Sequence, residues 1–166
     1  MEDLSILDCL NGLNSTVFDK ATKLLVVEIL ANKVADEAEG LAETDTQQLA
    51  KYFVKQLFLS ESSGEGVIQP RVANLYLGLL SNLTMPEGNS SVFCAQLGLD
   101  KEFGAQFTKL IEVYLSFNPQ SELEKVEEEK WVELDPFQHV GSILCNLCQV
   151  DSGRDVILKP STGHMV

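Results

Sequence analysis

The feature that most limits the possible folds is a segment that occurs twice. The first copy ends an apolar run with Leu-Leu-Ser-Asn-Leu-Thr at residues 79–84, and the second has Ile-Leu-Cys-Asn-Leu-Cys at residues 143–148. In both copies a Gly-containing polar turn and a pair of apolar residues follow, if one inserted residue is allowed in the second turn. Self-similarity of this kind is typical of proteins built by stacking one supersecondary unit.

Apolar residues recur with the 3.6-residue period of a helix through much of the chain. One stripe predicts an amphipathic helix over residues 45–59, opened by a capping box of Thr44 and Gln47. Another predicts a helix that Asp100 caps and that ends before Pro119. No sustained period-two alternation indicates a strand, so we expect an all-α fold. The two stripes consist of Ala50, Phe53, Val54, Leu57 and Phe58, and of Phe103, Phe107, Leu110, Ile111, Tyr114 and Leu115.

Other segments complete the expected set of helices. A short helix is predicted over residues 4–10, and a longer one over 15–35 is apolar on nearly every side, which favours a central place in the stack. Buried helices are predicted over 67–83 and 137–148, each followed by a polar turn and another short helix. Linkers are expected at the acidic residues 36–45 and in a flexible loop at residues 60–66.

The chain is expected to form a single domain over residues 1–166, because its length suits one core of ordinary size. Residues 119–134 are acidic and poor in core-forming side chains, which predicts a solvated insert. Trp131 lies in this insert. It is either an aromatic anchor for a basic partner or a pin that holds the insert on the stack, and we favour the pin because exposed tryptophan is uncommon.

The charge balance restricts the partners. Lys and Arg number 12 against 25 Asp and Glu, a net charge of −13. That sign disfavours nucleic acid and anionic membranes, which need a dense positive footprint, and favours a basic partner protein. No export signal precedes the first helix, and the four cysteines have no disulfide spacing. We therefore expect a cytoplasmic protein with reduced thiols, with nuclear presence left open.

The repeated Leu-x-Asn-Leu at the end of an apolar helix resembles armadillo repeats, and residues 79–93 and 139–158 resemble the HGH-type armadillo-like family. The 64 residues between the two asparagines exceed the roughly 40 to 47 of one armadillo or HEAT unit, and the acidic insert supplies the excess. The resemblance implies an armadillo/HEAT-like helical-repeat stack, an α-solenoid. It also implies a folding factor for translation elongation factor two that cooperates with the cytosolic chaperonin, present here as an N-terminal portion or short form.

The resemblance singles out Asn82 and Asn146 as partner-binding residues, since the equivalent amide in peptide-binding armadillo proteins contacts an extended main chain. The alternative is that each amide satisfies helix-end carbonyls. The tryptophan that such proteins often carry one turn earlier is replaced here by Gly78 and Ser142. This replacement favours a broad binding surface over a narrow peptide groove.

Enzymatic chemistry has little support in the sequence. Cys145 and Cys148 form a Cys-x-x-Cys without a second pair of ligands, so we interpret them as apolar fillers of a buried helix. His139 and His164 have no recognisable catalytic partners. We therefore expect no enzyme activity, no catalytic residues, no metal and no cofactor. The leading hypothesis is a chaperone or adaptor that binds a protein client, and the alternative is a structural scaffold that joins subunits of another complex.

Overall fold

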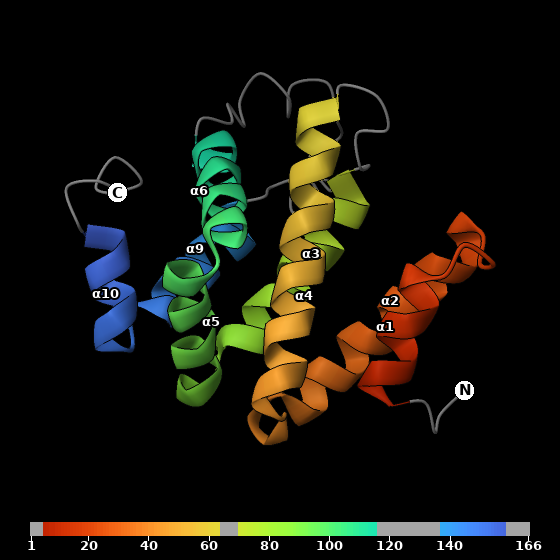
Figure 1. The fold of residues 1–166 in the computed structure, drawn as a ribbon, viewed down its shortest axis with the longest axis horizontal. Helices are drawn as coiled ribbons and strands as arrows, with labels where there is room; N and C mark the ends of the chain where they lie inside the picture. Colours follow the sequence, from red (N-terminus) through yellow and green to blue (C-terminus); the bar gives the residue numbers. More distant parts are fainter. Residues whose placement is uncertain (1–4, 64–69, 116–136, 159–166) are drawn as a thin grey trace.

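The computed structural model describes residues 5–63, 70–115 and 137–158, and all secondary structure in these ranges is helical. The all-α prediction is therefore confirmed for this part of the chain. Figure 1 shows the helices following one another along the long axis, from α1 and α2 at one end to α10 at the other. The elements are α1 (Ile6–Asn14), α2 (Lys20–Glu37), η1 (Ala38–Gly40), α3 (Glu43–Ser63), α4 (Pro70–Thr84), α5 (Glu87–Leu99), α6 (Lys101–Leu115), α9 (Phe137–Leu147) and α10 (Asp151–Leu158).

The helices pack in two neighbouring sets. In the first set α4 lies between α2 and α9 and contacts both. In the second set α3 packs against α6 and also touches α1. Helix α5 joins the sets, because it contacts α3, α4, α6, α9 and α10. This arrangement brings the carboxyl ends of α4 and α9, which carry the repeated motif, close to the same helix.

Aromatic packing holds α5 on α6. Phe93 is completely buried, and its ring centroid lies 5.2 Å from that of Phe103 and 5.1 Å from that of Phe107, both in edge-to-face geometry. Such pairs contribute roughly 0.5–1.5 kcal/mol beyond the burial of their area. The start of α6 is determined locally, because the Asp100 carboxylate accepts a hydrogen bond from the Phe103 amide at 3.1 Å. The predicted cap is confirmed.

Several predicted boundaries are wrong. Helix α3 begins at Glu43, so Thr44 lies inside it and the capping box with Gln47 does not form. Thr46, which is fully buried, donates from Oγ1 to the Ala42 carbonyl at 3.3 Å and ties the first turn to the core. The acidic linker predicted at residues 36–45 is mostly helical, because α2, η1 and α3 occupy nearly all of it.

The position predicted for α2 is also wrong. Its partners are α1, α4 and η1 at one end of the molecule, and α4 rather than α2 has helices of its own set on both sides. The helix starts at Lys20 behind the cap Asp19, and Leu25 on its surface is 52% exposed. An apolar run alone does not show whether a helix is covered on one face or on all of them. The loop prediction for residues 60–66 is wrong for 60–63, since α3 continues to Ser63, and its remainder lies outside the described residues.

Candidate functional site at the ends of α4 and α9

The motif asparagine of α9 is used inside the structure. Asn146 is half-buried, and its Nδ2 donates to the Ser81 carbonyl at 2.9 Å and to Thr84 Oγ1 at 3.2 Å. Both acceptors lie in the last turn of α4, where carbonyl groups lack intrahelical partners. The Asn146 amide of the second motif copy therefore bonds the end of α4, which carries the first copy. The sequence predicts two other roles for this amide, contact with a partner protein or with the end of its own helix.

Neighbouring side chains extend this contact into a network, which we call the α4–α9 junction. Ser90 Oγ donates to the carbonyls of Thr84 and Asn146, so α5 is bonded to the ends of both helices. Gln149 Nε2 donates to the Met85 carbonyl at 2.9 Å. Sequence reasoning missed Ser90 and Gln149, because neither lies in the aligned part of the motif.

The motif asparagine of α4 has a different environment. Asn82 is half-buried and lines a cavity of about 560 Å³ between the end of α2, η1 and the corner where α4 meets α5. Three carboxylates, from Asp36, Glu39 and Glu87, line the same cavity, which we call the acidic hollow. Within the described ranges the Asn82 amide makes no hydrogen bond to another side chain or to the backbone.

Asn89 forms the inner wall of the acidic hollow. Its side chain is only 6% exposed, and Nδ2 donates to the Ala38 carbonyl at 2.7 Å and to the Leu83 carbonyl at 2.9 Å. These bonds tie the first residue of η1 to the last turn of α4. Breaking these bonds would leave a buried amide and two buried carbonyls without hydrogen-bond partners, which is costly. Asn89 therefore holds this wall of the hollow in place.

The position that a tryptophan often takes in peptide-binding armadillo proteins is covered here by a histidine. The His139 ring of α9 lies over Gly78 of α4, with Cε1 3.4 Å from the point where a Cβ would stand. A Cβ at Gly78 would meet this ring at ordinary van der Waals distance, so alanine would fit there without displacing the ring.

The four cysteines are all free thiols. Cys148 is half-buried and packs on the core, whereas Cys145 is exposed, so the interpretation of Cys145 as a core filler is wrong. Cys94 is 3% exposed, and burial raises the pKa of its thiol to about 11. Among the described residues, no three His, Cys, Asp or Glu side chains are grouped closely enough to hold a metal ion.

Two sequence predictions lie outside the described residues. They concern Trp131 and the acidic insert at residues 119–134 that contains it. His164 also lies outside these ranges. Of the two predicted partner-binding residues that the structure describes, Asn82 lines the acidic hollow. Asn146 lies instead in the α4–α9 junction.

Comparison with known proteins adds no family. No family model, no curated protein and no solved structure matches the chain. No helix within the described ranges is both long and apolar enough to cross a membrane.

Proposed function

We propose that this chain is a non-enzymatic protein-binding module of the armadillo type, and that it binds an extended basic segment of its partner in the acidic hollow. The observation that carries the proposal is the Asn82 amide, which has no partner among the described residues and lies beside three carboxylates. An amide offers both donors and an acceptor to a peptide main chain. The carboxylates suit Lys or Arg side chains of the same segment.

Two electrostatic features of the molecule favour a basic segment as the ligand of the acidic hollow: its own carboxylates and the net charge of the chain. Among the described residues that line it, the hollow contains Asp36, Glu39 and Glu87 and no basic side chain. The net charge of −13 adds long-range attraction for a basic surface. A basic segment would thus be attracted at a distance and held at the hollow.

The armadillo assignment is supported by the order of packing. The helices that carry the repeated motif, α4 and α9, lie side by side, and α2 packs on the other side of α4. Helix α2 contains a fainter match to the motif, Ile29-Leu30-Ala31-Asn32, more than one turn before its end. A short helix follows each motif copy, as α5 follows α4 and α10 follows α9. Stacked units of this kind form extended binding surfaces.

The client that the family resemblance implies is translation elongation factor two during its folding, with the cytosolic chaperonin as a further partner. The module would act in the cytoplasm by stabilising the client form that it binds best, in proportion to its differential affinity. This mechanism needs no nucleotide, metal or other cofactor.

A scaffold that joins subunits of another complex is the second candidate. It is favoured by exposed apolar side chains at the α1–α2 end of the molecule, where Leu7 is 51% and Val17 is 85% exposed. Exposed apolar surface of this kind suits a permanent interface. The two functions differ in whether the bound partner is mature or still folding.

The test is affinity purification from eukaryotic cytosol followed by mass spectrometry. The hollow variant combines Asp36→Asn, Glu39→Gln and Glu87→Gln, and the control variant combines Glu28→Gln, Glu43→Gln and Asp155→Asn. Both remove three negative charges, but the control residues are exposed and do not line the hollow.

Elongation factor two and chaperonin subunits should be recovered with the wild type and the control, and about tenfold less with the hollow variant. Equal recovery with both variants would contradict a role for the hollow. A stable complex of mature, unrelated subunits would favour the scaffold.

A further inference from the structure

A second cavity lies between α1, α3 and α6, in the other set of helices. It measures about 380 Å³ and shares no lining residue with the acidic hollow. Its apolar lining includes the buried side chains of Leu10 and Phe103 and the half-buried Tyr52. Lys51 and Lys55 of α3 and Glu102 of α6 supply the charged lining. We call this cavity the lysine pocket.

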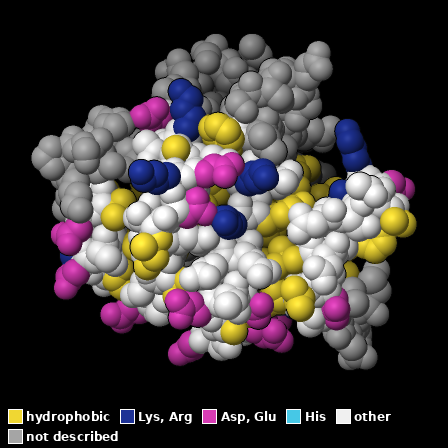
Figure 2. Space-filling model, viewed as in Figure 1, with side chains coloured by type: hydrophobic (Ala, Val, Ile, Leu, Met, Phe, Trp, Pro, Cys, Tyr) yellow, Lys and Arg dark blue, Asp and Glu magenta, His cyan; other side chains and the backbone are white. Residues whose placement is uncertain are grey.

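The charge of the lysine pocket opposes that of the whole chain. Its lining holds two lysines and one carboxylate, whereas the chain has 25 acidic residues against 12 basic ones. On the face seen in Figure 2, basic side chains gather over α3 and α6 with acidic side chains among them, and further acidic side chains line the edge near η1 and the start of α3. The excess of positive charge is therefore a property of the described lining of the pocket and not of the whole face.

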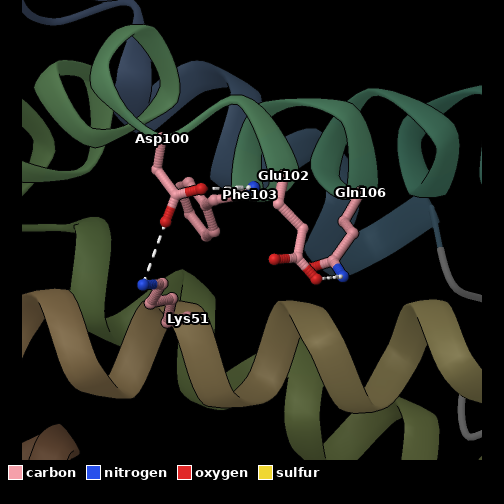
Figure 3. Close-up of polar contacts among 5 residues, drawn as sticks. All are labelled: Lys51, Asp100, Glu102, Phe103 and Gln106. Atoms are coloured by element: carbon pink, nitrogen blue, oxygen red, sulfur yellow. Dashed lines mark hydrogen bonds and ion pairs between the residues drawn. The ribbon is translucent and has the colours of Figure 1, made fainter.

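The two lysines differ in their partners. Lys51 Nζ lies 3.0 Å from Asp100 Oδ2, and Figure 3 shows this ion pair spanning the gap between α3 and the start of α6. Asp100 also caps α6 through its bond to the Phe103 amide, and this bond contributes most to the lowered pKa of its carboxyl. Lys55, one turn further along α3, has no ion-pair partner in the described part of the chain.

Across the pocket, the only carboxylate among the described lining residues, Glu102, is directed to a neighbour on its own helix. Glu102 Oε1 accepts a hydrogen bond from Gln106 Nε2 at 3.4 Å, as Figure 3 shows. This contact does not reach the lysines. Glu102 keeps its negative charge in this contact, but among the described residues it forms no ion pair with Lys55.

We propose that the lysine pocket binds an acidic segment of a partner protein, in which carboxylates flank an aromatic or aliphatic side chain. The carboxylates would pair with Lys55 and with the exposed side of Lys51, and the apolar side chain would rest on Tyr52, Leu10 and Phe103. Charge complementarity selects this occupant, because the rest of the chain repels acidic segments. The pocket volume lies within the range typical of sites that take one or a few side chains.

This site is independent of the proposed function. The acidic hollow takes a basic segment at the ends of α2 and α4, whereas the lysine pocket takes an acidic one between α1, α3 and α6. A partner that presents both kinds of segment would contact both sets of helices. Either site can fail without the other.

The test measures binding of a blocked hexapeptide of five glutamates and one central phenylalanine by isothermal titration calorimetry at low salt. The pocket variant is Lys51→Gln with Lys55→Gln, and the matched control is Lys20→Gln with Lys23→Gln on α2. Both variants change the net charge equally, and circular dichroism establishes that each is folded. The peptide with glutamines in place of glutamates is the ligand control.

The wild type and the α2 control should bind the glutamate peptide with similar affinity, and the pocket variant about tenfold more weakly. Glu102→Gln should strengthen binding about threefold, because it removes the one negative charge from the lining. No binding by the wild type, equal weakening in both double variants, or equal binding of the glutamine peptide would overturn the proposal.

Discussion

The carboxyl ends of α4 and α9 carry the same motif but serve different purposes. At the end of α9 the asparagine amide bonds the neighbouring helix, whereas at the end of α4 the equivalent amide faces the acidic hollow. The residue after the motif glycine differs too, because Asn89 is buried while Arg154 is exposed. The repeated motif thus forms the end of a helix in both copies, but the neighbouring helices decide which contacts its asparagine makes.

The largest expected difference concerns the two motif glycines. A Cβ on Gly153 would lie 1.8 Å from the Leu147 carbonyl oxygen, whereas a Cβ on Gly88 would meet nothing within 4 Å. Gly153→Ala should therefore lower the free energy of unfolding by about 3 kcal/mol, because backbone must move. Gly88→Ala should change it by less than about 1 kcal/mol, with a stabilising sign. Urea denaturation followed by circular dichroism measures both, and similar effects would contradict the difference in packing.

The next effect concerns the side chains that cap the two helix ends. Asn89→Ala leaves the buried carbonyls of Ala38 and Leu83 without this donor. It should therefore lower the free energy of unfolding by about 2 kcal/mol. Arg154 donates to the Cys148 carbonyl and pairs with Asp151 at the surface, so Arg154→Ala should cost less than about 1 kcal/mol. Thermal unfolding of both variants at equal concentration gives the comparison. A larger loss of stability for Arg154→Ala than for Asn89→Ala would contradict the predicted order of the two effects.

The two asparagines themselves should separate stability from binding. Asn146→Ala removes the bonds to Ser81 and Thr84 and should cost about 1–2 kcal/mol. Asn82→Ala removes no such bond and should change the free energy of unfolding by less than about 0.5 kcal/mol, yet weaken partner binding. Chemical denaturation measures the predicted changes in stability, and the affinity purification described above measures the predicted change in partner binding. Strong destabilisation by Asn82→Ala would show that this amide has a structural role.

The smallest effect is a difference in thiol reactivity between α5 and α9. At pH 8 Cys145 should react first with a disulfide reagent because it is exposed, and Cys94 should react only on unfolding. The folded-state pKa of Cys94 is raised from 9.0 to about 11, so its contribution to stability is unchanged below pH 9 and falls as the pH rises toward 11. Mass spectrometry of the labelled protein over time identifies the order. Early labelling of Cys94 would contradict its burial.

Local sequence signals predicted the helices more reliably than their ends. Asp100 caps α6 as predicted, because the interaction joins residues three apart and needs no other part of the chain. Thr44 fits a capping box equally well, yet α3 begins before it. Buried Thr46 contacts Asn89 from a distant helix, with Oγ1 3.5 Å from Asn89 Oδ1. A contact between such distant residues cannot be inferred from a local pattern.

Residues of the candidate site were predictable only in part. The motif identified Asn82 and Asn146, but a single pattern could not indicate that one amide bonds Ser81 while the other lines a cavity. The carboxylates of the acidic hollow come from α2, η1 and α5, and lie up to about fifty positions apart in the chain. Their proximity depends on how those elements pack.

The sequence by itself determined the all-α class, most of the helices, the cap of α6 and the negative charge, because each depends on composition or on residues within one or two turns. Only the tertiary structure decided which motif amide faces a cavity, which glycine tolerates a side chain and which side chains of α1 and α6 line the lysine pocket with those of α3. Each of these depends on the distance between residues of different helices. Those distances result from the packing of the whole core.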